Sequence, residues 1–145
     1  MDGESTTMRE QRPAAAKPPI KLALSSSKEP HFVEGRRPLW KYRDLGVTDA
    51  SGGRMRAQVT SGKDGMTQPT GWHDHLCETQ FVYILSGWVE LEFEKTGLVR
   101  LEAGDSVMIP GSLPHQETRT SDDFELLEVS LPAEMGTKSC DPPAP

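Results

Sequence analysis

The sequence has few cysteines and no long apolar run. Cys77 and Cys140 are its only cysteines among 145 residues, and they lie far apart. This usage is typical of neither a disulfide framework nor a cysteine-bound metal site, and it favours a reducing compartment. No stretch approaches the ~18 consecutive apolar residues of a membrane span, and the N-terminus lacks the apolar run of a secretory signal. We therefore expect a cytoplasmic protein with no membrane partner.

Positive charge is also scarce. The chain has 16 Lys and Arg against 22 Asp and Glu, for a formal net charge of −6. In residues 32–131 the same count is 10 against 16. A surface of this sign repels phosphate backbones, so we expect no nucleic-acid partner.

Glycine and tryptophan are concentrated in the middle of the chain. Residues 32–131 contain 11 of the 13 glycines and all three tryptophans. About a hundred residues are enough to bury a core without disulfides. We predict an N-terminal arm or tail at 1–31, a folded domain at 32–131 and a Pro-rich C-terminal tail at 132–145. Within the arm, residues 20–24 alternate and could pair as an edge strand.

The middle segment offers no convincing long amphipathic helix. Its apolar residues mostly alternate with period two, and turns with glycine separate the runs about every ten residues. The candidate strands include 39–43, 55–59, 89–93 and 127–131. This pattern predicts an all-β protein, either a sandwich or a barrel.

Three of the four histidines fall in two short segments. His73 and His75 are two residues apart, so on a strand their imidazoles project from the same face and can reach one ion. His115 from a different strand would complete a facial set of three. One oxygen ligand would then make four protein ligands and leave open positions for water or substrate.

The spacing around these histidines resembles the two motifs of the cupin superfamily. Those motifs are G-x5-H-x-H-x(3–4)-E-x6-G and G-x5-P-x-G-x2-H-x3-N. The matching residues are, in order, His73, His75, Gly87, Gly104, Pro110 and His115. Gln80 replaces the motif glutamate, Ser112 the second glycine and Arg119 the asparagine. No glycine stands at the family's distance before the first histidine.

The resemblance covers roughly residues 35–131. It implies a double-stranded antiparallel β-helix, the cupin jelly-roll barrel, with a metal inside. It further implies one divalent ion (Zn, Fe, Ni or Mn) held by His73, His75, Gln80 and His115. Small cupins resemble one another in pairing through their sheets, so we also expect a homodimer.

The glutamine is the informative departure from the motif. A neutral amide leaves a divalent ion more positive than a carboxylate does, which favours Lewis-acid chemistry on a carbonyl or water. A set of three histidines and Gln80 is similar to that of polyketide cyclases and of pectin-degradation proteins that open unsaturated uronic acids. We therefore predict a metal-dependent enzyme for isomerisation, cyclisation or ring opening of a small organic metabolite.

Alternatives stay open at this stage. Three histidines also permit an iron-dependent dioxygenase, and the barrel could bind a ligand without catalysis. Glu78 or water could take the place of Gln80 as fourth ligand.

Two further expectations concern the pocket. Glu117 shares the face of His115 and is a candidate catalytic acid or base, although it could equally pair with Arg119 or Arg56. Val82 and Ile84 share the parity of the glutamine at position 80 and would give the pocket an apolar wall.

Overall fold

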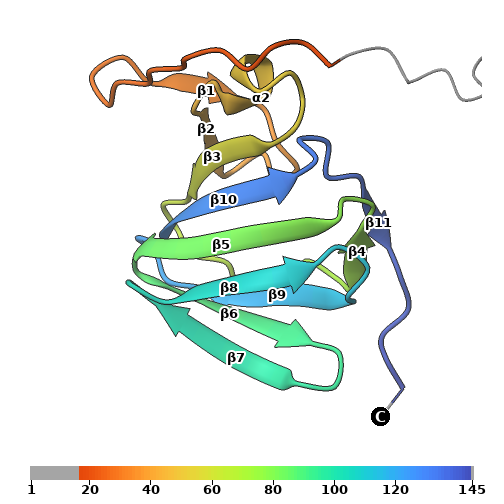
Figure 1. The fold of residues 1–145 in the computed structure, drawn as a ribbon. Coiled ribbons are helices and arrows are strands. Elements are labelled where there is room, and N and C mark those ends of the chain that lie inside the picture. The colour runs from red at the N-terminus through yellow and green to blue at the C-terminus, as the bar shows by residue number, and fades with distance from the viewer. Residues whose placement is uncertain (1–16, 145) are drawn as a thin grey trace, which may run out of the picture.

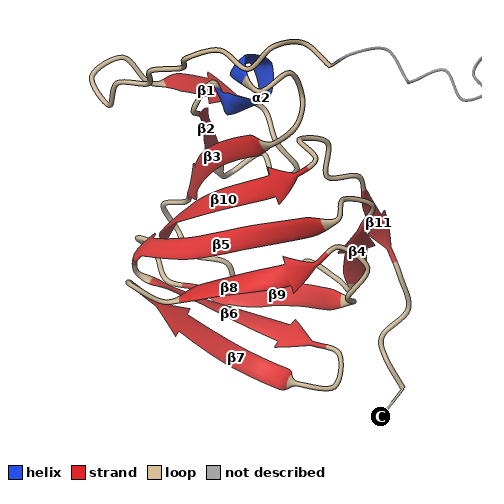
Figure 2. Cartoon of the chain, in the orientation of Figure 1, coloured by secondary structure: helices blue, strands red, loops and turns tan. Residues whose placement is uncertain are grey.

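The computed structural model describes residues 17–144, which form a jelly roll of two antiparallel sheets (Figures 1 and 2). The first sheet runs in the order β1 (His31–Val33), β2 (Lys41–Asp44), β3 (Arg56–Ser61), β10 (Glu125–Leu131), β5 (Thr79–Ser86) and β8 (Ser106–Pro110). The second runs β11 (Thr137–Ser139), β4 (His73–His75), β9 (His115–Thr120), β6 (Trp88–Phe93) and β7 (Gly97–Glu102). The fold class predicted from the sequence is confirmed.

The chain crosses between the two sheets at every connection after β3 except the β6–β7 hairpin. Segments far apart in the sequence therefore become neighbours: β10 lies between β3 and β5, and β9 lies between β4 and β6. Gly87 makes the sharp β5–β6 crossing, with φ of +67° and no room for a Cβ against Ser121 and Phe124. This topology brings both histidine segments into one sheet.

The core lies between the sheets. Its buried members come from alternate positions of the strands, as the period-two pattern predicts. They are Val82, Ile84, Val89, Leu91, Phe93, Leu101, Ile109, Phe124 and Leu126. Val82 and Ile84 face inward as expected, and Tyr83 between them is exposed on the outer face.

Two strands turn polar residues toward the interior. On β3, Arg56, Gln58 and Thr60 line the internal cavity, while Val59 lies on the other face. On β10, Glu128 does the same. The cavity is therefore apolar on one side and polar on the other.

The flanking segments differ from a simple pair of tails. Residues 20–24 form no strand, although the Lys21 N–H donates to the Ala50 carbonyl at 2.7 Å beside the one-turn helix α2 (Val47–Ala50). Within the segment predicted as a C-terminal tail, β11 pairs with β4. Three alternating residues are too short a pattern to reveal such a strand. No helix among residues 17–144 is long and apolar enough to cross a membrane.

Candidate metal centre

Three buried histidines meet at one point inside the barrel. His73 and His75 project from the same face of β4, and His115 on β9 lies directly opposite His73 in the register of the sheet. Their ring centroids are 4.5 to 5.2 Å apart. One ligand atom from each residue lies within 4.8 Å of the others. The group could hold one metal ion.

Backbone carbonyls fix the orientation of two of the rings. His73 Nδ1 lies 2.7 Å from the Gly71 carbonyl oxygen, and His115 Nδ1 lies 3.0 Å from that of Leu113. A carbonyl can only accept, so each Nδ1 carries the proton and each Nε2 is left with its lone pair. Such outer partners are typical of metal-binding histidines because they set the tautomer.

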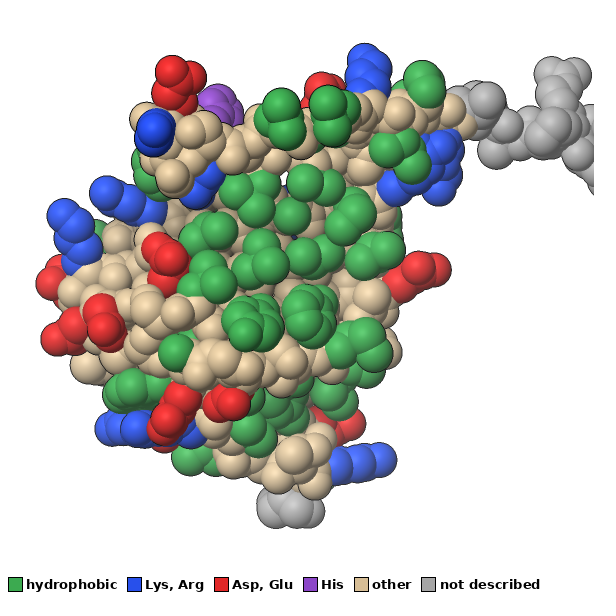
Figure 3. Space-filling view, turned by 60° about the vertical axis from the view of Figure 1, so that its left-hand side comes forward, with side chains coloured by type: hydrophobic (Ala, Val, Ile, Leu, Met, Phe, Trp, Pro, Cys, Tyr) green, Lys and Arg blue, Asp and Glu red, His purple; other side chains and the backbone are tan. Residues whose placement is uncertain are grey.

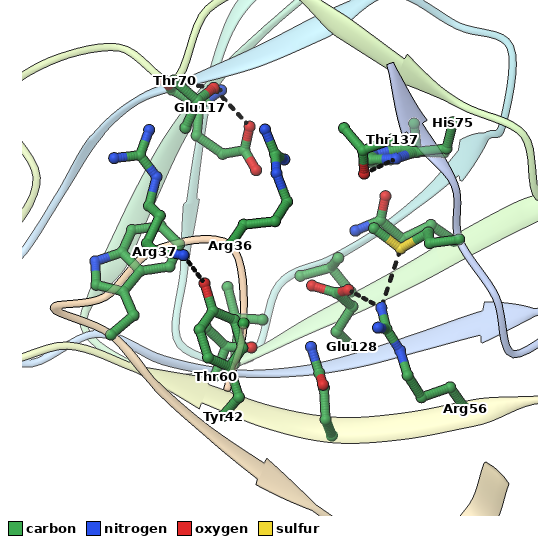
Figure 4. Close-up of a pocket in the computed structure, with 18 of the residues that line it drawn as sticks. Arg36, Arg37, Tyr42, Arg56, Thr60, Thr70, His75, Glu117, Glu128 and Thr137 are labelled. Atoms are coloured by element: carbon green, nitrogen blue, oxygen red, sulfur yellow. Dashed lines mark hydrogen bonds and ion pairs between the residues drawn. The ribbon is translucent and has the colours of Figure 1, made fainter. Parts of the chain in front are cut away.

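The third ring is held by the strand that the sequence did not reveal. His75 Nδ1 lies 2.9 Å from Thr137 Oγ1, and Thr137 is its partner across the β4–β11 ladder (Figure 4). A threonine hydroxyl can accept from Nδ1 and leave Nε2 free for an ion. No motif around the histidines points to this residue.

The loop between β8 and β9 is docked on strand β4. Gly111 packs so closely on β4 and the following turn that a Cβ would collide with the Cys77 carbonyl oxygen. Its carbonyl accepts from the His75 N–H at 2.7 Å, and its N–H donates to the Glu78 carbonyl at 3.0 Å. This docking ties the loop before His115 to the strand that carries the other two histidines.

Gln80 comes from the opposite sheet and lines the same cavity as His75 and His115. Its side chain is 5% exposed, and its Oε1 has no hydrogen-bond partner. His73 Nε2 is also buried without one. Buried polar atoms are rarely left unsatisfied, so these two atoms fit a site built for a cation. Glu78, the alternative ligand, is exposed and does not line the cavity.

Burial favours the neutral form of the two imidazoles on β4. It lowers the pKa of His75 to about 4, with the neighbouring His115 and His73 adding to the effect. Burial likewise lowers the pKa of His73, against an opposing effect of Glu117. The neutral form is the one that binds metals, so His73 and His75 are ready to coordinate at neutral pH.

Glu117 lies at the edge of this cluster. Its Oε2 is 3.5 Å from His73 Nε2 and accepts from the Thr70 hydroxyl at 3.1 Å. Burial acts to raise the pKa of Glu117, but the nearby His73, His115 and Arg36 and the Thr70 hydrogen bond together lower it. Glu117 pairs with neither of the arginines considered from the sequence.

Those arginines have other partners. Arg119 pairs with Glu90 at 2.9 Å, and Arg56 pairs with Glu128 at 2.8 Å inside the cavity. Burial raises the pKa of Glu128, while the charge of Arg56 opposes that rise. Glu128 belongs to neither histidine motif. Only its alternation with leucine and valine on β10 could have indicated an inward carboxylate.

The cavity has a volume of about 540 Å³, enough for a small organic molecule. Its apolar wall includes Val82, Ile84, Val89 and Leu91. Polar side chains face it from the other side, and Figure 4 shows them converging from β2, β3, β9, β10 and the loop before β2. This is the usual layout of a small-molecule site.

The two curved sheets and the enclosed histidine cluster define a small jelly-roll protein with a candidate metal site. Residues 62–130 match the profile of the family described as the cupin domain. The segment that carries all three histidines thus matches the cupin domain, as the histidine spacing predicts.

Solved structures share this fold at low sequence identity. The polyketide cyclase RemF from Streptomyces resistomycificus has a TM-score of 0.65 and 17% identity, covering 84% of this chain and 87% of RemF. KdgF from Halomonas sp. has a TM-score of 0.63 and 18% identity, and the match covers 77% of this chain and 96% of KdgF. The Fe(II) form of HppE has a TM-score of 0.60 and 17% identity, and the match covers 82% of this chain and 66% of HppE. No curated protein matches this chain significantly in sequence.

Proposed function

We propose that this cupin is a metal-dependent enzyme that acts as a Lewis acid on a small organic metabolite. The ligands would be His73, His75, His115 and Gln80. The observation that carries this proposal is the donor set, which consists of three buried imidazoles, two of them with a pKa lowered by burial, and one amide oxygen without a partner. A divalent ion there would retain its full charge and polarise a substrate carbonyl or a water molecule.

The remaining residues have complementary roles. The apolar wall around Val82, Ile84 and Leu91 excludes water from the substrate. Glu117 is the catalytic acid–base candidate: its Oε2 can hold or move a proton, and the Thr70 hydroxyl keeps that carboxylate in place. The reaction class is an isomerisation, cyclisation or ring opening, for which none of these residues need change oxidation state. Supporting the cyclase reading is the fold shared with the polyketide cyclase RemF.

A second candidate is an iron-dependent dioxygenase. The three-histidine face permits it, and the fold is shared with the Fe(II) form of HppE. A non-catalytic ligand-binding barrel is the third possibility. Gln80 favours the Lewis-acid enzyme over the dioxygenase because a neutral donor keeps the ion electrophilic.

Metal identity and oxygen use together separate these functions. The full chain is purified without added metal, its metal content is measured, and samples are then reloaded with Zn, Ni, Mn or Fe. Each is incubated with a panel of carbonyl and hydroxy compounds while oxygen uptake and product formation are followed. Turnover with zinc, nickel or manganese and no oxygen uptake is the expected result. Turnover restricted to iron with oxygen consumption would establish the dioxygenase instead.

We also propose that the protein is a homodimer. Figure 3 shows a broad apolar area over the outer face of the first sheet and the arm beside it. This outer apolar face comprises Phe81, Tyr83, Leu85, Met108 and Leu131 of the sheet and Ile20, Leu22 and Leu24 of the arm. Together they expose roughly the 800 Å² of surface that each partner of a stable complex buries. The face carries no charge of its own, so a second copy of the same face is a suitable partner.

A cytoplasmic location and the three-segment organisation are proposals of the same kind. The first is supported by two cysteines that stay free, Cys77 buried and Cys140 partly buried. For the second, the buried residues of the main hydrophobic cluster lie within 32–131.

A further inference from the structure

A structured loop covers part of the cavity. Gly35, between β1 and β2, packs so tightly on the Tyr42 ring that any Cβ would overlap it. The Arg37 N–H donates to Tyr42 Oη at 3.1 Å, and Trp40 packs edge-on against Phe124 with ring centroids 4.9 Å apart. These contacts fix the backbone of the loop on the barrel, so the side chains between them have defined directions.

Three arginines line the cavity, and two of them are engaged. Arg37 lies over the Trp40 ring at 5.3 Å, and Arg56 pairs with Glu128. Among residues 17–144, the Arg36 side chain has no ion-pair or hydrogen-bond partner. Figure 4 shows it reaching from the loop toward Glu117. Arg36 therefore has guanidinium N–H donors without a protein partner at the cavity.

The charge of Arg36 acts on groups from both sheets. It contributes to lowering the pKa of His73 and His75 on β4 and of Glu117 on β9, and it opposes the raised pKa of Glu128 on β10. Arg36 is an exposed residue that lines the mouth of the cavity, and its guanidinium points toward Glu117 (Figure 4).

A second polar group in the cavity also lacks a partner. Thr60 Oγ1 on β3 is buried, with its residue 2% exposed, and forms no hydrogen bond. Water or a ligand oxygen would satisfy it. Besides the candidate metal ligands, the cavity wall therefore has polar groups without a protein partner at Arg36, at Thr60 Oγ1 and at Arg56 Nε.

We propose that Arg36 binds a carboxylate or phosphate group of the substrate, so that this enzyme selects small organic anions. The inference rests on the proposed metal site, which would take the reacting oxygen of the same molecule. A guanidinium binds either anion through two parallel N–H···O bonds, which fixes orientation as well as affinity. Thr60 would donate to a further oxygen of the ligand.

The test compares charged and neutral probes. Binding of 3-hydroxypropionate, its methyl ester and glycerol 3-phosphate is measured by calorimetry on the zinc-loaded and zinc-free full chain. The same measurements are made on Arg36→Gln and on Arg100→Gln as the control, since Arg100 lies on the outer surface over Trp88. We expect Arg36→Gln to weaken binding of at least one of the two anions about tenfold or more, because charge-assisted bonds are lost. The ester should be unaffected, and the control should match the unmodified chain.

The outcome separates this inference from the proposed function. If Arg36→Gln weakens binding of only the carboxylate or only the phosphate probe, that result identifies the anion that Arg36 binds. Equal binding of both anions by Arg36→Gln and the unmodified chain would overturn the role of Arg36, even if zinc content is full. Failure of the chain to take up zinc would instead contradict the proposed function, and the zinc-free arm would still test Arg36.

Discussion

Gln80 places a neutral amide in the cavity where the family motif has a carboxylate. Replacing it with Glu adds Coulomb attraction to a bound cation and offsets one unit of its charge at the reacting oxygen. We expect Gln80→Glu to tighten zinc binding roughly tenfold, as measured by competition with a chelator, and to lower Lewis-acid turnover. Glu78→Gln, at an exposed neighbouring position, is the control and should change neither. Equal zinc affinity of Gln80→Glu and the unmodified chain would remove Gln80 from the site and restore the dioxygenase to equal standing.

The pair of Arg56 and Glu128 sets the polarity of one cavity wall. Arg56→Met leaves the Glu128 carboxylate poorly solvated and without its cation, so we expect a loss of about 2 kcal/mol in the free energy of unfolding at pH 7. Arg119→Met breaks the exposed pair with Glu90 and should cost less than about 1 kcal/mol.

The loss of unfolding free energy in Arg56→Met should be larger at pH 7 than at pH 4. Burial raises the pKa of Glu128, and removing Arg56 raises it further. The folded chain then holds that proton more tightly than the unfolded chain, so stability is recovered below the ordinary carboxyl range and lost as pH rises through the folded pKa. Denaturant unfolding of the metal-free proteins at pH 4 and pH 7 measures this. A difference between Arg56→Met and the unmodified chain that stays constant with pH would contradict the account.

At the scale of elements, the sequence predicted where most strands lie. It did not predict, for every strand, which face points into the barrel. On β6 the apolar members of the alternation are buried, whereas β5 is apolar on both faces and buries the face of Val82 and Ile84. On β3, Arg56, Gln58 and Thr60 face the cavity. An alternating pattern indicates that the two faces of a strand differ in polarity. When the interior is a polar binding cavity, the pattern does not indicate which face points inward. The strands that deviate from apolar-inside are therefore the strands that form the site.

Strand β11 was missed for a different reason. Its three residues are too few to show a strand pattern. Its contribution to the site is the Thr137 hydroxyl. Thr137→Val removes the contact between Oγ1 and His75 Nδ1 while preserving shape and the β4–β11 ladder. We expect zinc affinity to fall about tenfold, because an outer partner no longer orients the imidazole.

Thr137→Ser keeps the hydroxyl and is the matched control. Chelator competition on both variants gives the comparison. If Thr137→Val and Thr137→Ser bind zinc equally well, β11 has no role in positioning the ligand.

For the whole molecule, motif spacing predicted more than periodicity did. Alternation alone indicated an all-β sandwich or barrel. The two histidine segments resemble the cupin motifs, and that resemblance implied the jelly roll, in which residue 73 lies opposite residue 115. The position of the arm could not be predicted from its sequence. Its apolar residues Ile20, Leu22 and Leu24 suggested an edge strand, yet they form no strand and are exposed.

The proposed homodimer makes use of that exposed arm and the sheet beside it. Light scattering at micromolar concentration should give about twice the 16.0 kDa of one chain. The double variant Tyr83→Lys and Met108→Lys puts two like charges on the outer apolar face, so we expect it to be monomeric. Leu98→Lys, on β7 of the other sheet, should leave the mass unchanged. An unmodified chain that scatters as a 16 kDa monomer would contradict the dimer.

Metal binding by the histidine cluster is the central claim, and elemental analysis tests it most directly. The chain is reloaded with zinc, freed of excess metal and measured alongside His75→Ala and His115→Ala. We predict close to one zinc per unmodified chain and far less than one in each variant, with the β-sheet circular dichroism signal retained. Unchanged zinc content in both variants would show that the ion is not held by His75 and His115.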